Sequence, residues 1–394
     1  MTDDVRLVAD ASELERAANR LASADRLAVD VESNGLFKYR ATLCTIQIAS
    51  PDEIVVVDAI ATKLLPPLSA AGLALRDLLG AAGPRKIVHD VAFDARILAE
   101  AGIALGNVLD TSIAARMLGR QATGLASLMK ELGVDLDKKL QHHDWTQRPI
   151  GAVELRYLAD DVVHLEDLAR KLEGELEVAG IADAVEEETR YRLAQAIAAA
   201  GTVDPRPAWV RLKGVDRAPR DEWPILRRLA EIREARARAL DVPPYKVVGP
   251  DVLFAIARAK PASFAELDRI KGATAGSRAR GIASAMVEAV HAGPVPEEEL
   301  AFLDKPRPPA AVQKARRARE TRLTSWRKTE AKARGIDEQV VLPGHCLQDL
   351  ADLADLSAAG IATIAGLGAF RIARDADAIL RALVEPEPEP EAAP

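Results

Sequence analysis

The chain has few cysteines and no long apolar segment. Its 394 residues include two cysteines, Cys44 and Cys346, which lie too far apart in sequence for a zinc-type spacing. We expect both to be reduced thiols. No apolar run approaches the roughly 20 residues of a membrane span. The first residues, Met-Thr-Asp-Asp, lack the basic and then apolar character of a signal peptide. These absences predict a cytoplasmic protein without a membrane partner.

Length and charge indicate several domains with uneven charge. A chain of 394 residues with 48% hydrophobic content can bury a sizeable core and predicts two or three domains. The net charge is −7, yet residues 305–334 contain 11 Lys and Arg against two acidic residues. Such a density can follow a phosphate backbone or form a solvated helix face. The sequence alone leaves both interpretations open.

Two acidic residues share one face of a predicted strand. Residues 27–32, Leu-Ala-Val-Asp-Val-Glu, alternate in polarity as a buried strand does, so Asp30 and Glu32 point to the same side. Like charges held this close are electrostatically costly, and a divalent cation is the usual compensation. The alternative is an edge strand whose two acids are solvated. Carboxylates further along the chain decide between the two interpretations.

The elements that follow predict a mixed sheet covered by helices. Strands at residues 43–49 and 54–58 have a short connection, which suggests an antiparallel meander. A helix at 73–79, a short buried strand at 86–89 and a helix at 91–101 come next. The change from consecutive strands to strands alternating with helices predicts an α/β domain whose sheet has helices on at least one face.

Other acids near helix starts have competing interpretations. Asp94 lies in the first turn of the helix predicted at 91–101, where it can reach neighbouring strand ends or simply compensate the helix dipole. Asp90 is a candidate cap of the same helix, and we assign Asp110 and Thr111 to capping the helix that follows them. The polar stretch 138–145 predicts a surface loop near the site or the substrate.

A long amphipathic helix is predicted at residues 154–172, where apolar residues repeat every three or four positions. Tyr157 and Asp161 are one turn apart and therefore share a face, whereas Asp160 is rotated by about 100°. The spacing selects Asp161 as the partner of Tyr157. An ordinary surface pair is the alternative.

The ordered set of these motifs resembles the tyrosine subtype of the DEDD exonuclease superfamily. An Asp-x-Glu strand, an Asp in the helix after Lys-Ile-Val-His, and a Tyr-x-x-x-Asp helix occur in the order that this superfamily has. Further stretches narrow the resemblance to the ribonuclease D family. They are Leu-Cys-Thr-Ile-Gln-Ile at 43–48, His89, Leu-Asp-Thr at 109–111, Asp-Trp at 144–145 and Arg-Pro at 148–149.

The C-terminal half resembles two HRDC domains, the small helical modules shared by helicases and ribonuclease D. Residues 223–292 carry Pro-Pro-Tyr-Lys-Val-Val at 243–248, and residues 310–384 look like a more divergent copy. We therefore expect a ribonuclease H-like α/β exonuclease domain at 1–204 and two all-α HRDC-like domains at 215–295 and 308–384. A disordered acidic Glu/Pro tail is expected at 385–394.

The resemblance implies a 3′–5′ exoribonuclease that trims RNA 3′ ends, with tRNA precursors as the suggested substrates and nucleoside 5′-monophosphates as products. Two divalent cations, Mg²⁺ or Mn²⁺, would be held by four carboxylates, and a nearby phenol would orient the attacking water. An apolar side chain after the first motif would pack on the terminal base or belong to the core. The residues concerned are Asp30, Glu32, Asp94 and Asp161 for the metals, Tyr157 for the water and Leu36 for the base.

Two alternative functions remain at this stage. Ser-Asn-Gly-Leu at 33–36 is closer to proofreading exonucleases, which favours an enzyme acting on DNA ends in repair. An inactive nucleic-acid-binding scaffold is the other alternative, although all four acids and Tyr157 are present. Basic residues of the helical domains, at 227–238 and 305–334, are expected to bind RNA phosphates. Nothing in the sequence requires more than a monomer.

Overall fold

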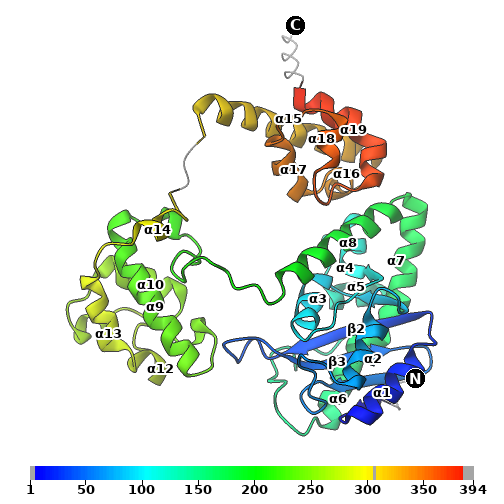
Figure 1. Ribbon diagram of the computed structural model, residues 1–394, viewed down its shortest axis with the longest axis horizontal. Helices are drawn as coiled ribbons and strands as arrows, with labels where there is room; N and C mark the ends of the chain where they lie inside the picture. Colours follow the sequence, from blue (N-terminus) through cyan, green and yellow to red (C-terminus); the bar gives the residue numbers. More distant parts are fainter. Residues whose placement is uncertain (1–4, 305–307, 385–394) are drawn as a thin grey trace. The chain divides into compact units, whose positions relative to one another are not determined.

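The computed structural model describes residues 5–304 and 308–384, which form two compact units (Figure 1). The first unit combines the described parts of Met1–Glu32, Leu43–Gly201 and Pro308–Pro394. The second combines Ser33–Thr42 with the described part of Thr202–Arg307. The predicted tail at 385–394 lies outside the described residues. Within the described residues, no helix has both the length and the apolar character to cross a bilayer.

A six-stranded mixed sheet forms the centre of the first unit, in the order β1-β4-β3-β2-β5-β6. Strand β1 is parallel to β4, and β5 is parallel to both β2 and β6, whereas β3 and β4 are antiparallel as predicted. The interior strand β2 buries Leu27, Val29 and Val31, as its alternation requires. The strands are β1 (Val5–Val8), β2 (Arg26–Ser33), β3 (Leu43–Ala49), β4 (Ile54–Asp58), β5 (Arg85–Val88) and β6 (Val108–Asp110).

Helices pack around this sheet and confirm the predicted α/β class. Helix α1 packs on α2, α3 packs on α8, and α6 contacts β1, β3 and β4. The strands and helices that carry the candidate catalytic residues are therefore packed against other elements of the domain on several sides. The helices are α1 (Ala11–Leu21), α2 (Ala70–Leu79), α3 (Val91–Glu100), α4 (Thr111–Met117), α5 (Leu125–Met129), α6 (Ala152–Val163), α7 (Leu165–Ala179) and α8 (Ala182–Ala199), with a 3₁₀ turn at Lys130–Leu132.

The helix predicted at 154–172 is divided in the structure. Residue His164, at φ −107° and ψ 3°, ends α6 and precedes α7, so the prediction of one continuous helix is wrong. The pair Val162-Val163 lowers helix propensity before the break, because β-branched side chains are restricted in a helix. Glu166 and Asp167 then place negative charge in the first turn of α7, where the helix dipole favours it.

Asp110 caps two helices at once. Its buried carboxylate accepts the backbone N–H groups of Ser112 at 2.7 Å and Ile113 at 3.1 Å, which confirms the predicted cap of α4. It also accepts the N–H of Val91 at 2.8 Å, at the start of α3. Asp90 occupies the N-cap position of α3 in a left-handed conformation, φ 71°, and makes no side-chain cap hydrogen bond. The predicted capping role of Asp90 is therefore wrong, because Asp110 supplies the acceptor.

The second unit is helical around its own core, to which Trp209 and Trp223 contribute as buried side chains. Two α9 arginines expected to bind RNA make internal contacts instead: Arg227 pairs with Glu299 at 2.8 Å, and Arg233 is buried. Its helices are α9 (Trp223–Ala239), α10 (Pro250–Ala259), α11 (Phe264–Asp268), α12 (Gly276–Arg280), α13 (Ala283–Glu288) and α14 (Glu297–Leu300). Its 3₁₀ turns are Val215–Arg217, Arg220–Glu222, Pro244–Lys246 and Ala289–His291.

Residues 33–42 belong to the second unit, although they follow β2 directly in the chain. Lys38 forms a 2.8 Å ion pair with Asp241, and the Tyr39 hydroxyl donates a 2.7 Å hydrogen bond to Glu234. The Arg238 guanidinium lies over the Tyr39 ring. The segment after Glu32 is thus anchored by helix α9 and the residues that follow it.

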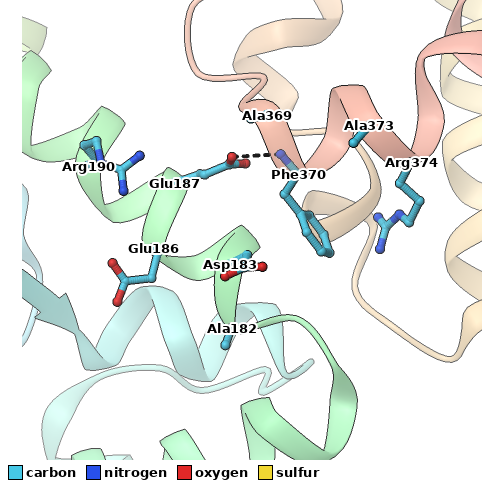
Figure 2. A pocket seen from close by; sticks show the side chains of 9 residues that line it. All are labelled: Ala182, Asp183, Glu186, Glu187, Arg190, Ala369, Phe370, Ala373 and Arg374. Atoms are coloured by element: carbon cyan, nitrogen blue, oxygen red, sulfur yellow. Dashed lines mark hydrogen bonds between the residues drawn. The ribbon is translucent and has the colours of Figure 1, made fainter.

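The C-terminal helices of the first unit have a separate core that includes Leu323, Leu350 and Ile379. They contact α8, where Glu187 accepts the backbone N–H of Phe370 at 2.8 Å (Figure 2). Gly368, at φ +79°, allows this approach, because a Cβ atom there would collide with the Glu187 carboxylate. The helices are α15 (Ala310–Arg334), α16 (Glu338–Val341), α17 (Gly344–Ala351), α18 (Ala358–Ala362) and α19 (Ala369–Val384).

Replacing Asp110 with Ala should lower the free energy of unfolding by about 3 kcal/mol, because two helix starts lose their acceptor in a buried place. The matched control is Asp10→Ala, which removes the exposed cap of α1 and should cost about 1 kcal/mol. Urea unfolding followed by circular dichroism gives both values. Equal losses for the two variants would contradict the double-cap interpretation.

Candidate active site

Three carboxylates from two elements meet in one cluster. Strand β2 presents Asp30 and Glu32 on the same face, and α6 supplies Asp161. One side-chain oxygen from each of the three lies within 4.8 Å of the others. This cluster offers oxygen ligands, the kind that Mg²⁺ and Mn²⁺ prefer. Asp160, which the helical spacing set aside, is not in the cluster.

Asp94 lies beside the cluster but outside the set of three. It sits in the first turn of α3 and is 3% exposed. Burial raises the pKa of its carboxyl well above the usual range, and the nearby charge of Asp30 raises it further. Its Oδ2 atom is buried without a hydrogen-bond partner among the described residues. An unsatisfied buried carboxylate oxygen next to three other acids fits a cation ligand better than a helix-dipole compensator.

Burial and mutual repulsion favour the protonated forms of the carboxyls in the cluster. Burial raises the pKa of Asp30 to about 7. The pKa of Asp161 rises to about 8, chiefly through burial and then through repulsion by the charge of Asp30. The pKa of Glu32 rises to about 9, chiefly through burial and then through repulsion by Asp30 and Asp161. A divalent cation would reverse this effect, since it favours the ionised carboxylates.

Tyr157 stands one helical turn before Asp161. Burial raises the pKa of its phenol, and the charges of Asp161 and Glu32 raise it further. The hydroxyl therefore stays protonated at neutral pH and can donate or accept a hydrogen bond.

Trp145 is a site residue that the sequence analysis did not select. The loop at 138–145, predicted to lie at the surface, ends in this residue, whose side chain is only 2% exposed. Its ring lies 5.8 Å from that of Tyr157, and its side chain forms a hydrogen bond to Glu32 that lowers the pKa of that carboxyl. The signal in the sequence was an aromatic residue at the end of a polar stretch.

Arg148 fixes the position of Trp145. Its guanidinium forms two bonds to Asp58, at 2.6 and 2.8 Å, and donates to the Trp145 carbonyl at 2.7 Å. Asp58 ends strand β4 and is buried. This bidentate pair ties the loop to the sheet and so holds the indole against Glu32.

Leu36, the candidate for packing on a terminal base, is 44% exposed. The alternative of core packing is therefore wrong for this side chain. Its carbonyl accepts a 3.4 Å hydrogen bond from the Tyr245 hydroxyl within the second unit. The structure contains no nucleic acid, so a role for Leu36 at the base stays a prediction.

Comparisons with known proteins define the class of enzyme to which this chain belongs. Residues 5–177 match the family described as 3′–5′ exonuclease, and residues 224–290 and 316–383 each match the HRDC domain family. The carboxylate cluster falls within the exonuclease match. The chain is thus a 3′–5′ exonuclease that carries two HRDC domains.

Relatives narrow the class to one family. Ribonuclease D of Nitrobacter hamburgensis is 31% identical over 308 residues, which cover 76% of this chain and 77% of the relative. Ribonuclease D of Jannaschia is 31% identical, covering 73% and 74%. The crystal structure of Escherichia coli RNase D shares the fold, with a TM-score of 0.67 at 22% identity over 96% of this chain and 98% of that chain. The chain belongs to the ribonuclease D family and is a hydrolase, a 3′–5′ exoribonuclease.

The raised pKa values predict how stability depends on pH when no metal is bound. In the folded state these carboxyls lose their protons between about pH 7 and pH 9, but when unfolded they lose them near pH 4, so stability falls as pH rises from about 4 to about 9. In EDTA, the melting temperature should fall from pH 6 to pH 9, and it should fall less in Glu32→Gln. Glu15→Gln, an exposed control on α1, should follow the wild type. Identical pH profiles for Glu32→Gln and the wild type would refute the burial argument.

Proposed function

We propose that this exoribonuclease removes nucleotides from RNA 3′ ends by hydrolysis that depends on two divalent cations. The observation that carries the proposal is the cluster of Asp30, Glu32 and Asp161 oxygens within 4.8 Å, beside the unsatisfied Asp94 carboxylate. All donors are hard carboxylate oxygens, which fit Mg²⁺ or Mn²⁺. Bound cations would supply an activated water and would neutralise charge on the leaving 3′ oxygen.

Each residue of the site has a separate role in this proposal. Asp30, Glu32, Asp94 and Asp161 hold the cations. Tyr157 orients the attacking water through its protonated hydroxyl, because its raised pKa excludes general-base action at neutral pH. Trp145 positions Glu32 through their hydrogen bond. Nucleoside 5′-monophosphates are the proposed products.

Structured RNA with a 3′ extension, such as a tRNA precursor, is the proposed substrate class. The Escherichia coli relative is described as an exoribonuclease involved in structured RNA processing, which supports this assignment. DNA ends are the competing substrate, favoured by the Ser-Asn-Gly-Leu sequence at 33–36. An inactive scaffold is disfavoured, because its acids would have no reason to remain buried together. Cytoplasmic location, a monomeric state and the boundaries 1–204, 215–295 and 308–384 stay predictions.

An end-labelling assay tests the reaction, its polarity and its substrate together. RNA and DNA oligomers of the same sequence, labelled at the 5′ end, are incubated with Mg²⁺ or Mn²⁺ and with EDTA. We expect RNA to shorten from its 3′ end one nucleotide at a time, DNA to shorten more slowly, and EDTA to stop both reactions. A clear preference for DNA would overturn the substrate assignment, and cleavage in EDTA would overturn the metal assignment.

Two variants separate metal binding from water positioning. Asp30→Asn should reduce cleavage at least 10³-fold, because its neutral side chain binds cations weakly, and should leave RNA binding largely intact. Tyr157→Phe should lower kcat by about 10²-fold, the usual size of a lost positioning contact, with little change in KM. Single-turnover kinetics and fluorescence anisotropy give these values. Full activity of Asp30→Asn would refute the metal assignment, and unchanged kcat in Tyr157→Phe would remove that residue from the mechanism.

A further inference from the structure

The loop that follows the catalytic strand is closed at its base. Residues 33–42 connect β2 to β3, which are neighbours in the sheet, and they begin directly after Glu32. The Asn34 side chain accepts the backbone N–H of Thr42 at 2.8 Å and donates to the Thr42 hydroxyl at 2.8 Å. Asn34 is buried, and its carbonyl accepts two N–H groups of the turn that follows. The loop therefore has little slack between its base and its tip.

Three residues in α9 and just after it hold the tip of this loop. The Lys38 ammonium and the backbone N–H of Tyr39 both donate to the carboxylate of Asp241, at 2.8 and 3.3 Å. The Tyr39 hydroxyl donates to Glu234 at 2.7 Å. The Arg238 guanidinium lies 5.5 Å from the centre of the Tyr39 ring. We name Glu234, Arg238 and Asp241 the α9 clamp.

The α9 clamp has a rigid support. Tyr39 packs against the hydrophobic core of the second unit, to which α9 contributes buried residues such as Leu229. The side chain of Glu234 is only 15% exposed. Next to the clamp, the Lys246 ammonium lies 4.2 Å from the centre of the Phe37 ring, an attractive cation–π arrangement. The tip of the loop is therefore fixed to the core of the second unit.

Asp241 occupies a position that usually favours glycine. Helix α9 ends in the two backbone hydrogen bonds of a Schellman motif, from Asp241 to the Arg238 carbonyl at 3.2 Å and from Val242 to the Ala237 carbonyl at 3.0 Å. Asp241 has φ +48°, in the left-handed region where a side chain is unfavourable. A strained residue of this kind points to a function, and here its carboxylate accepts both donors of the loop tip.

We infer that the α9 clamp positions the loop after Glu32 for catalysis, so that the first HRDC domain contributes to the rate of cleavage; the inference rests on the proposed function. The loop carries Leu36, the predicted contact of the terminal base, whose carbonyl accepts a hydrogen bond from Tyr245. A fixed Leu36 holds the terminal nucleotide in place before reaction, and such positioning raises kcat. The members of the clamp act through the loop and are positioning residues.

The variant Asp241→Gly separates this role from a structural one. Glycine suits the left-handed backbone, so the melting temperature should stay the same or rise, although the carboxylate that holds Lys38 and Tyr39 is lost. Lys260→Gly is the matched control. Lys260 also has φ +48°, ends α10 in the same unit and forms a 2.7 Å ion pair with Asp221.

Single-turnover cleavage of a fluorescein-labelled RNA hexanucleotide, with Mn²⁺ and enzyme in excess, gives the maximal rate and the half-saturating enzyme concentration separately. We expect Asp241→Gly to lower the maximal rate about tenfold and to change the half-saturating concentration less than about twofold, because positioning is lost rather than affinity. Lys260→Gly should match the wild type. Asp241→Asn should recover most of the rate, because Asn keeps an acceptor oxygen and tolerates the left-handed backbone.

Hydrogen exchange followed by mass spectrometry reports on the loop directly. Backbone amides of residues 35–42 should exchange faster in Asp241→Gly than in the wild type, because the Tyr39 N–H loses its acceptor and the tip is released. The same amides should exchange at the wild-type rate in Lys260→Gly.

Faster exchange in Asp241→Gly with an unchanged maximal rate would overturn the inference, since the loop would then be held without serving catalysis. An unchanged exchange rate, or an equal loss of cleavage rate in Lys260→Gly, would overturn it as well. Failure of the proposed function has a different signature, because the wild type itself would then leave the hexanucleotide intact.

Discussion

The structure depends on holding like-charged carboxylates together in a buried place. Strand β2 alone puts Asp30 and Glu32 side by side, and the packing of α3 and α6 adds Asp94 and Asp161. Without a cation this arrangement is unfavourable, as the raised pKa values of its members indicate. Such a destabilising cluster persists only where the surrounding fold enforces it, which is typical of a catalytic site.

Residues outside the carboxylate cluster hold its members in position. Arg148 and Asp58 fix the loop that places Trp145 against Glu32, and Asp110 fixes the starts of α3 and α4. Each of these contacts satisfies backbone groups or buried charges with good geometry. These contacts therefore stabilise the fold and also determine the orientation of the acidic side chains.

The sequence was enough to predict the strands of the sheet and the shared faces of Asp30 with Glu32 and of Tyr157 with Asp161, because these follow local periodicity. The choice of the four acids as metal ligands came from the family resemblance. Alternation over 27–32 and helical spacing between Tyr157 and Asp161 are visible without knowledge of contacts. Trp145 and the double cap by Asp110 were not predictable in this way, because their partners lie far away in the chain. The break at His164 was also missed, since the apolar spacing continues across it. Long-range contacts decide such features, and a single sequence does not encode them as a pattern.

The number of basic residues in a segment also differs from the number that can bind a partner. Eleven Lys and Arg at 305–334 suggested one nucleic-acid surface, yet Arg319, Arg322 and Arg334 complete the packing of the C-terminal helices. Charge density alone therefore overestimates a binding surface, and only the exposed face of a helix can be assigned to a partner. The ribonuclease D family relationship establishes the reaction, while side-chain contacts show which basic residues already have partners within the protein.

Anomalous diffraction from crystals soaked in Mn²⁺ tests the central claim most directly. The account predicts manganese peaks coordinated by oxygens of Asp30, Glu32 and Asp161, with a second ion bound through Asp94. Peaks elsewhere in the molecule with none at these carboxylates, or carboxylates too far apart to share an ion, would contradict it.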